Sequence, residues 1–366
     1  MSPFPPGLAV PGPDPLGLGT LAAAPPAVAE AELLALLRSR YGRTGPIARL
    51  PGERDANYLV EDPAGGRAVL KLFNGAEPAA ARALQRAVLL HLAGRPMPLA
   101  VPRLIPTRAG GTGCAIAGAD GPVDAMLVSF VPGEPWSARP SGAGLRGAVG
   151  EAAARLRRAL AGFDPPAARR SLPWDLMGLG RLAPVAAALP AGPRRAWLSA
   201  FVARFEAELR PAAAALPAGA IHNDLNPSNV LLHPGQDRVC GLIDFGDLLH
   251  GPLIADLAVA CSYDLAAADP AEAVADVAAG YARVVPLALR EAGILFDLVL
   301  ARLVLRVLVY AWRAGRGAGA EPYLARHAAP AHAALDAVMA LPPGHGRAGV
   351  LARLRRDDLL APEARP

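Results

Sequence analysis

Residue types suited to catalysis gather in one short stretch of the chain, residues 221–247. A polar loop holds His222, Asp224 and Asn229, and an apolar run ends at Asp244. Phosphoryl transfer requires a carboxylate that accepts the proton of the attacking hydroxyl, and oxygen ligands that hold Mg²⁺ on the nucleotide phosphates. We therefore expect Asp224 to act as the base. Asn229 and Asp244 are the predicted metal ligands, because Mg²⁺ prefers hard oxygen donors.

The order of these residues follows the pattern HxDxxxxN and then DFG. Protein kinases carry this pattern as their catalytic-loop and metal signature, although Asn223 stands here where they have arginine. Either half alone is weak evidence, because an HxD triplet is often a turn and DFG is often a bend after a strand. Their order and short separation favour a phosphotransferase site, a hypothesis that the rest of the chain must support.

Lys71 is the only lysine in the chain, so its location is informative. It lies in a predicted strand, and protein kinases keep the lysine that pairs with nucleotide phosphates on such a strand. The ordinary alternative is a surface lysine on a strand face. We predict that Lys71 binds the phosphates. Asparagines are also sparse, and three of the five fall in the polar loop.

The first third of the chain predicts a small sheet with one helix. Alternating apolar residues and turn residues predict strands over 47–50, 56–61, 67–73, 114–117 and 124–131, and helical spacing predicts a helix over 78–92. The turn at 51–55 has a single glycine. Phosphate contacts from its backbone N–H groups and an ordinary hairpin turn both stay open.

Two further nucleotide contacts are expected in this part of the chain. Protein kinases place a glutamate on the helix to hold the lysine, but residues 78–92 contain none. Gln85 or Glu77 is expected to orient Lys71 instead. The last strand is expected to lead into a hinge where backbone groups of Ser129 and Val131 bond a purine ring. A plain buried strand fits the same apolar run.

Helical periodicity dominates the remaining chain. Helices are expected over 145–160, 177–189, 194–216, 252–265, 271–284, 287–312 and 322–341, and a further one over 28–40. The prediction is an α+β, protein-kinase-like two-lobed fold, with a small β-sheet N-terminal lobe (27–131) and a mainly helical C-terminal lobe (132–345). Residues 1–26, rich in Pro, Gly and Ala, are expected to be a disordered tail, and 346–366 a C-terminal tail.

Composition restricts the class of partner. The chain has 366 residues, 53% of them hydrophobic, a net charge of +5 and a pI near 9.5. Its arginines are scattered with few aromatics between them, which argues against nucleic acid and leaves an anionic nucleotide as partner. Three cysteines without metal-ligand spacing (Cys114, Cys240 and Cys261) predict a reducing, cytoplasmic setting rather than disulfides or zinc.

The most apolar predicted helix, near 294–310, contains Asp297, Arg302 and Arg306. It is therefore interpreted as a buried core helix, and no membrane span is expected. The two arginines could face a substrate carboxylate, although a buried ion pair or a snorkelling side chain is the commoner role.

The motifs taken together resemble the aminoglycoside phosphotransferase and choline kinase superfamily, whose members often have HGD where this chain has His222-Asn223-Asp224. The segments ERDANY, VLKLFN and GLIDFGDLLHGPLIADLAVA resemble the hydroxylysine kinases and the phosphotransferase domains fused to class III aminotransferases. The resemblance covers about residues 30–341. It implies transfer of a nucleotide γ-phosphate to a small hydroxylated amine or amino acid, with Asp224 as base, Asn229 and Asp244 on the metal and Lys71 on the phosphates.

Several neighbouring residues are candidates for supporting roles. His222 is expected to hold the loop rather than transfer a proton, because Asp224 suits the chemistry better. Asp256 is expected to anchor backbone N–H groups of the loop. Asp247 is a candidate for the substrate amine or the metal, with turn capping as the alternative. Asp264 is a weaker amine-binding candidate, and Trp174 lines the acceptor pocket or packs the lobe.

The sequence therefore predicts a cytoplasmic, Mg²⁺-dependent small-molecule kinase that uses ATP or GTP. The expected acceptor is hydroxylysine or a similar hydroxylated amine. One alternative is an aminoglycoside-type antibiotic phosphotransferase, for which a strongly acidic acceptor cleft is expected. Another is a nucleotide-binding pseudokinase scaffold, which the retained Asp224, Asn229, Asp244 and Lys71 argue against.

Overall fold

The structure is a computed structural model that describes residues 23–362 apart from 53, 64–65, 120 and 316–321. Most of the predicted N-terminal tail, 1–26, thus lies outside the described residues, as does Glu53 in the turn at 51–55. The described chain forms two compact units. We call residues 23–132 with 241–246 the sheet unit, and residues 133–240 with 247–362 the helical unit.

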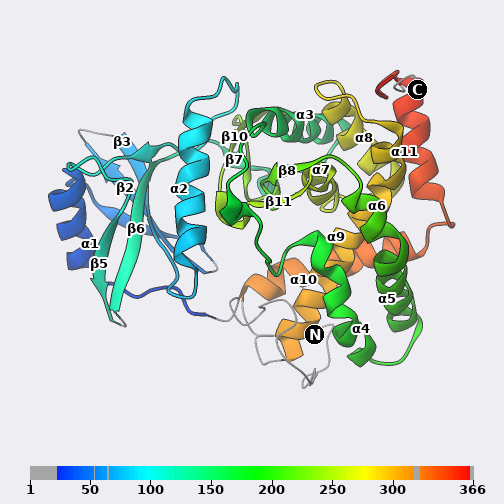
Figure 1. The fold of residues 1–366 in the computed structure, drawn as a ribbon, viewed down its shortest axis with the longest axis horizontal. Coiled ribbons are helices and arrows are strands. Elements are labelled where there is room, and N and C mark those ends of the chain that lie inside the picture. Colours follow the sequence, from blue (N-terminus) through cyan, green and yellow to red (C-terminus); the bar gives the residue numbers. More distant parts are fainter. Residues whose placement is uncertain (1–22, 53, 64–65, 120, 316–321, 363–366) are drawn as a thin grey trace. The chain divides into compact units, whose positions relative to one another are not determined.

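The sheet unit is an antiparallel sheet in the order β1-β2-β3-β6-β4, with β5 also paired to β6. Its elements are α1 (Glu30–Leu36), η2 (Leu37–Tyr41), β1 (Ile47–Leu50), β2 (Ala56–Asp62), β3 (Gly66–Leu72), α2 (Ala79–Ala93), β4 (Leu104–Ile105), β5 (Cys114–Gly118) and β6 (Gly121–Ser129). Figure 1 shows α1 and α2 on opposite sides of this sheet. The predicted strands and both predicted helices are confirmed, and β4 was not predicted.

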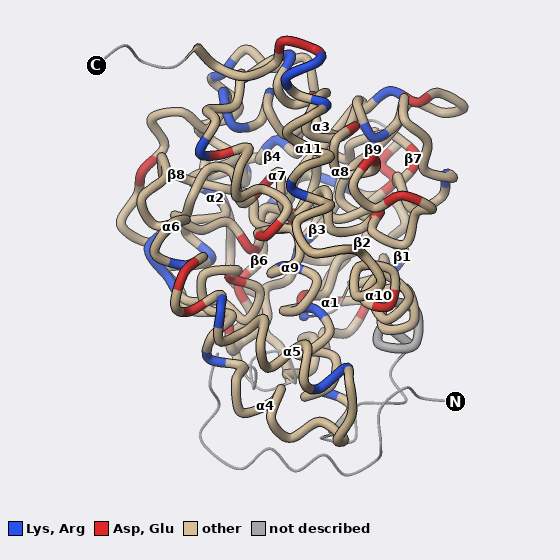
Figure 2. The backbone as a smooth tube through the Cα atoms, turned by 90° about the vertical axis from the view of Figure 1, so that its right-hand side faces the viewer, with Lys and Arg blue, Asp and Glu red and all other residues tan. Residues whose placement is uncertain are grey.

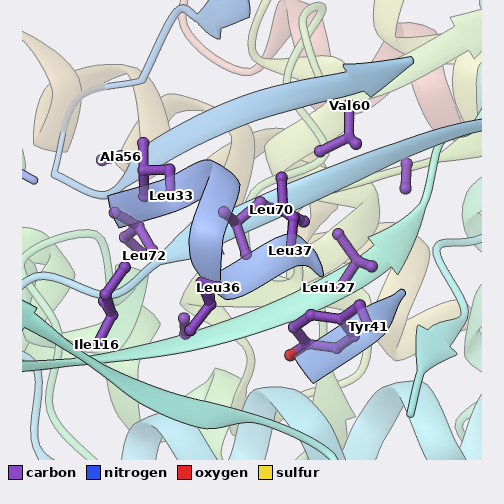
Figure 3. Close-up of a cluster of buried hydrophobic side chains, with 12 residues drawn as sticks. Leu33, Leu36, Leu37, Tyr41, Ala56, Val60, Leu70, Leu72, Ile116 and Leu127 are labelled. Carbon is purple, nitrogen blue, oxygen red and sulfur yellow. The ribbon is translucent and has the colours of Figure 1, made fainter. Parts of the chain in front are cut away.

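One face of the sheet packs against α1 and so fixes where Lys71 points. Leu33, Leu36 and Leu37 form a buried cluster with Leu70 and Leu72, among other sheet residues (Figure 3). Successive side chains of a strand alternate between faces. The side chain of Lys71 is therefore directed to the other face, the one that α2 covers.

The helical unit contains most of the helices of the described chain. Its elements are β7 (Glu134–Pro135), η3 (Trp136–Ala138), α3 (Ala143–Ala159), η4 (Pro166–Ala168), η5 (Leu176–Leu182), α4 (Ala183–Ala188), α5 (Pro193–Arg204), η6 (Phe205–Leu209), α6 (Arg210–Ala214), β8 (Ala218–Ile221), β9 (Val230–Leu232), β11 (Leu249–Pro252), α7 (Ile254–Cys261), α8 (Pro270–Ala282), α9 (Leu289–Gly315), α10 (Pro322–Met339) and α11 (His345–Arg356). Two elements, β10 (Val239–Leu242) and η7 (Phe245–Asp247), contain residues of both units.

Short strands hold the polar loop in place. β8 leads into the loop and pairs antiparallel with β11, so that Ile221 lies opposite Leu249. These two residues are buried with Leu172 and Ala255, which joins the strand pair to the start of α7. The loop thus begins at a packed strand end rather than in a freely moving segment.

Three expectations about the helical unit need correction. The predicted helix over 177–189 is a 3₁₀ segment, η5, followed by the short helix α4. The predicted helix over 194–216 contains a π-helical turn, η6, between α5 and α6. Helix α11 occupies much of the segment that was predicted as a C-terminal tail, 346–366. It is held partly by Arg353, which lies 3.0 Å from Asp276 of α8.

The long apolar helix is buried, as predicted. Most of α9 lies in the core, including Arg302 and Arg306. Among the described residues, no helix combines the length and apolar character needed to span a membrane. Figure 2 shows basic and acidic segments interspersed along the chain.

Helices α3 and α8 pack closely through glycines. A Cβ on Gly150 would overlap the carbonyl oxygen of Val277, and one on Gly280 would overlap that of Gly147. Gly147 itself has room, because its Cβ would meet only Arg283 Nη1 at 3.7 Å. Gly147 has room for a larger side chain, whereas Gly150 on the same helix does not.

We predict that Gly150→Ala lowers the free energy of unfolding by about 1–3 kcal/mol, because overpacking forces backbone shifts. Gly147→Ala, the matched control on the same helix, is expected to raise it by roughly 0.5–1 kcal/mol, because alanine restricts the unfolded chain. Urea denaturation of both variants measures the difference. Equal effects of the two substitutions would contradict the close packing of α3 and α8.

Candidate active site

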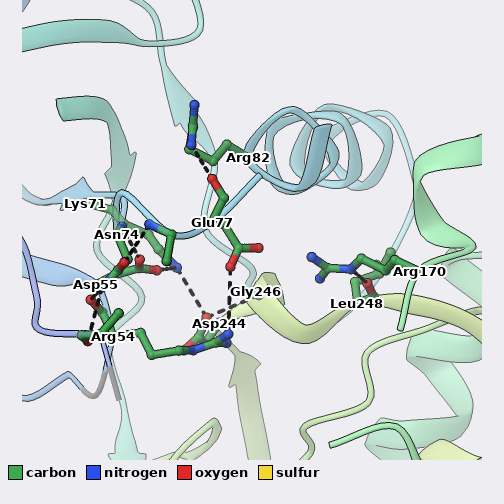
Figure 4. Close-up of polar contacts among 12 residues, drawn as sticks. Arg54, Asp55, Lys71, Asn74, Glu77, Arg82, Arg170, Asp244, Gly246 and Leu248 are labelled. Atoms are coloured by element: carbon green, nitrogen blue, oxygen red, sulfur yellow. Dashed lines mark hydrogen bonds and ion pairs between the residues drawn. The ribbon is translucent and has the colours of Figure 1, made fainter. Parts of the chain in front are cut away.

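Lys71 lies in a cluster of carboxylates within the sheet unit (Figure 4). Its Nζ atom is 2.9 Å from Asp55 Oδ2 and 3.5 Å from Asp244 Oδ1. Burial lowers the pKa of Lys71, but the negative charges of Asp244 and Asp55 outweigh that effect and raise it overall. The ammonium is therefore charged at neutral pH.

Asp55 is held in turn by Asn74. The backbone N–H of Asn74 donates to Asp55 Oδ1 over 2.8 Å, and the Asn74 side chain donates to the carbonyl of Arg54 over 2.9 Å. The second carboxylate oxygen of Asp55 is thereby directed to Lys71. Asn74 is buried, with 4% of its surface exposed, so its hydrogen bonds to this turn are shielded from water.

Asp55 was not among the residues selected from the sequence. Gln85 or Glu77 was expected to orient Lys71, but Glu77 instead pairs with Arg54 at 3.7 Å. Gln85 is buried near the same place, since a Cβ on Gly246 would lie 3.6 Å from Gln85 Nε2 and 3.8 Å from Lys71 Nζ. Its role in orienting Lys71 stays a prediction.

The strand register contained the signal that would have identified Asp55. Asn57 lies opposite Lys71 in the β2–β3 pair. Asp55 precedes Asn57 by two residues, so it lies on the same face, diagonal to the lysine. Diagonal neighbours in an antiparallel pair are within reach of long side chains.

The polar loop of the helical unit is held by Asp256, as the sequence predicted for this residue. Asp256 Oδ2 accepts the N–H of His222 over 2.8 Å, and Oδ1 accepts the N–H of Asn223 over 2.7 Å. His222 is fully buried, and its Nδ1 accepts the N–H of Asp224 over 3.2 Å. Both residues thus support the loop rather than face solvent.

Asp224 is oriented by two amides of its own loop. Its Oδ2 atom accepts from Asn229 Nδ2 over 2.8 Å and from Asn226 Nδ2 over 2.9 Å. Asn229 Nδ2 also donates to the backbone carbonyl of Asp224 over 3.0 Å. The Asp224 side chain keeps 22% of its surface exposed, so it remains accessible to an acceptor. Asn226 was not selected from the sequence.

The two predicted metal ligands, Asn229 of the helical unit and Asp244 of the sheet unit, each carry oxygen donors of the kind that Mg²⁺ prefers. In Asn229 the amide nitrogen donates to Asp224, so the side-chain carbonyl oxygen is the atom that would bind a metal. Asp244 has φ 62° and accepts the N–H of Gly246 over 3.2 Å, and its side chain is 51% exposed. No cluster of three His, Cys, Asp or Glu side chains suited to a metal occurs in the described chain. A kinase-type site needs no such cluster, because Mg²⁺ is held by one or two carboxylates and by substrate phosphates.

Four other predicted residues lie in different surroundings. The backbone N–H of Ser129 donates to Arg103 O over 2.8 Å, and its hydroxyl accepts the Arg103 N–H over 2.9 Å, so both are used within the protein. Val131 and Asp247 are buried. Asp264 accepts the Ser141 hydroxyl over 2.6 Å and lies 3.5 Å from Arg146.

Trp174 belongs to a buried aromatic group. Its ring meets Tyr310 edge to face at 6.1 Å, and its backbone carbonyl accepts from Arg302 Nη1. Arg302 Nη2 lies 3.6 Å from Asp224 Oδ1. Arg302 therefore contacts both Trp174 and the predicted base, Asp224. The sequence alone had not identified the partner of Arg302.

Solved structures of small-molecule kinases share the fold of this chain. The microcompartment-associated aminopropanol kinase matches with a TM-score of 0.61 at 19% identity, over 90% of this chain and 98% of that one. An amicoumacin kinase in complex with AMP-PNP and Ca²⁺ matches with a TM-score of 0.60 at 16% identity, over 84% and 94%. The predicted kinase-like α+β fold is confirmed.

Sequence comparison identifies the family to which the chain belongs. The model of the phosphotransferase enzyme family matches residues 46–294, and the chain belongs to this family. The hydroxylysine kinase of Mus musculus is 26% identical over 312 residues, which cover 78% of this chain and 82% of the mouse protein.

We predict that Asp55→Asn increases the acylation rate of Lys71 by about tenfold at fixed pH, because removing the negative charge of Asp55 lowers the pKa of Lys71 and so increases the fraction of reactive free amine. The measurement is clean, since Lys71 is the only side-chain amine. Mass spectrometry of the labelled peptide gives the rate. Asp62→Asn is the matched control, because that carboxylate belongs to the same sheet unit but pairs with Arg43 at 3.5 Å. An unchanged rate in Asp55→Asn would show that Asp55 does not hold Lys71 in solution.

Proposed function

We propose that the protein is a Mg²⁺-dependent kinase that transfers the γ-phosphate of ATP or GTP to the hydroxyl of a hydroxylated amine or amino acid such as hydroxylysine. The observation that carries this proposal is the geometry at Asp224. Two amides fix one of its oxygens, and the side chain remains partly exposed. A positioned carboxylate of this kind can take the proton of an attacking alcohol.

Each residue has a defined part in this reaction. Asp224 orients the acceptor hydroxyl and accepts its proton as the O–P bond forms and the nucleoside diphosphate leaves. Lys71, charged and held by Asp55 and Asp244, pairs with nucleotide phosphates. Asn229 and Asp244 would hold Mg²⁺, which neutralises charge developing on the phosphate oxygens.

The likeness to hydroxylysine kinase supports an acceptor that combines a hydroxyl with an amine. The name of the aminopropanol kinase describes the same combination of groups. All three cysteines are free thiols, which suits the reducing cytoplasm that we propose as the location.

An aminoglycoside acceptor is less well supported. Such polycations need several unpaired carboxylates around the base. Asp264, one of the few acidic candidates, is already bonded to Ser141 and paired with Arg146. A pseudokinase scaffold is also less well supported, because Asn226 and Asn229 orient Asp224 as a base would need.

We predict that Asp224→Asn lowers kcat by about 10²–10⁴-fold, the usual contribution of general-base catalysis. Nucleotide affinity should change by less than about threefold, because the base acts mainly in the transition state. Nucleoside diphosphate release and titration calorimetry measure the two quantities. Asp237→Asn is the control, since Asp237 belongs to the same unit but pairs with Arg139 at 3.1 Å. Near-normal turnover in Asp224→Asn would remove the base assignment.

We also predict that hydroxylysine or a related hydroxy amino acid stimulates diphosphate release at least about tenfold more than any aminoglycoside, which corresponds to 1.4 kcal/mol of differential transition-state binding. The measurement is kcat/KM across a panel of both acceptor classes with ATP and with GTP. The reverse ranking would favour the resistance-kinase alternative. Nucleotide binding without turnover on any acceptor would favour the scaffold.

A further inference from the structure

Arg302 is a charged residue in an otherwise apolar part of α9. It is 1% exposed, and its neighbours on the helix, Ala301 and Leu303, are fully buried. A buried guanidinium is unfavourable unless carboxylates and carbonyl oxygens satisfy it. The identity of those partners therefore shows what the charge is used for.

One carboxylate pairs with this guanidinium, and its charge also acts on two others. Arg302 Nη2 is 3.6 Å from Asp224 Oδ1. Burial raises the pKa values of Asp175 and Asp256, and the positive charge of Arg302 opposes that effect at both. Asp224 is the predicted base, Asp256 anchors its loop, and Asp175 caps η5 by accepting the N–H of Met177 over 2.9 Å. The positive charge of Arg302 thus acts on Asp224 and on the two aspartates that hold neighbouring segments.

The other end of the guanidinium is fixed. Nη1 donates to the carbonyl of Trp174 over 2.5 Å, and the guanidinium lies over the Trp174 ring at 5.5 Å. The Nε atom has no hydrogen-bond partner in the described structure. Arg302 is therefore held from the side of Trp174 while Nη2 is directed at the base.

The two carboxylate oxygens of Asp224 thus have different neighbours. Asn226 and Asn229 occupy Oδ2 with short hydrogen bonds, whereas Arg302 approaches Oδ1 at 3.6 Å. A full charge-assisted hydrogen bond would be about 2.7–2.9 Å long. At the longer distance the guanidinium attracts the carboxylate through its charge rather than through a short hydrogen bond.

Resting on the proposed function, we propose that Arg302 is a positioning residue for phosphoryl transfer: its ion pair holds the Asp224 side chain in the orientation in which this carboxylate receives the proton of the acceptor. The sequence context made Arg302 a candidate for a substrate carboxylate or a buried ion pair. The contacts with Asp224 and Trp174 assign it to the base instead.

The test is a double-mutant cycle between Arg302→Met and Asp224→Asn. Methionine keeps the length and apolar stem of arginine but removes the charge. We expect Arg302→Met to lower kcat by about 100-fold, because small misplacements of a catalytic group cost that much. Acceptor KM and nucleotide Kd should change by less than about threefold. In the Asp224→Asn background, Arg302→Met should lower the residual kcat by less than about twofold, since its target is already gone.

Arg302→Lys retains the positive charge but removes the planar guanidinium. A lysine ammonium cannot reproduce the geometry by which Arg302 contacts Trp174 and Asp224 together. We expect it to recover about a tenth of wild-type kcat, which a role in packing alone would not produce. If Arg302→Met fails to fold, the same cycle is run with Arg302→Lys. Arg157→Met is the matched control, because Arg157 is a largely buried arginine of the same unit that contacts Tyr281 and Glu291. Its effect on kcat should be the same with and without Asp224→Asn.

The outcomes separate the two proposals. If Arg302→Met lowers kcat by the same factor in both backgrounds, Arg302 does not act through Asp224 and this inference is overturned, while the base assignment stands. If Asp224→Asn alone keeps near-normal turnover, the proposed function fails and the inference with it. If the Arg302 effect disappears only in the Asp224→Asn background, the positioning role is supported.

Discussion

The catalytic loop depends on one buried carboxylate. Asp256 is 3% exposed and accepts the N–H groups of two consecutive residues, His222 and Asn223. Buried backbone N–H groups must be paired, and consecutive ones are directed to one point only when the chain turns sharply. Asn223 makes that turn with φ 65°. The bend that presents Asp224 is therefore stabilised by the buried side chain of Asp256.

This arrangement joins electrostatics to the shape of the loop. Burial raises the pKa of Asp256, whereas His222, the two N–H groups and Arg302 oppose the shift. The ionised carboxylate is the form that accepts two hydrogen bonds at once. Arg302 thus serves the loop twice, because its charge favours the ionised form of Asp256 and also attracts Asp224.

The sheet unit solves a related problem in a different way. Protein kinases hold the strand lysine with a glutamate on a helix, but here the helix carries arginines that pair with an acid on a strand. Helix α2 contributes Arg82 and Arg86, which pair with Asp124 of β6 at 3.0 and 2.5 Å. The acid for Lys71 comes from the turn before β2, where Asn74 supports Asp55. The lysine can therefore be fixed by the sheet itself, without an acid on α2.

Much of this could be predicted from sequence, for identifiable physical reasons. The hairpin of β2 and β3 follows from the turn residues between two apolar runs, and Asp55 follows once the register is drawn. β8 and β9 have four and three residues, too few for a periodic signal. Helix α11 buries little apolar surface, chiefly Val350 and Leu354, so its pattern looks like a polar tail. The partners of Arg302 required three-dimensional contacts, because Trp174 and Asp224 lie far from it in sequence.

Asn223 shows which property of the loop is required. Its φ of 65° favours glycine, and asparagine is among the few other residues that tolerate it. Its side-chain oxygen and nitrogen have no hydrogen-bond partner among the described residues, which costs about 1–3 kcal/mol for a buried polar group. The side chain thus destabilises the loop while the backbone keeps the bend that Asp256 holds. The site therefore depends on a left-handed backbone at this position, and on the two N–H groups that it directs to Asp256, rather than on the amide that this chain carries there.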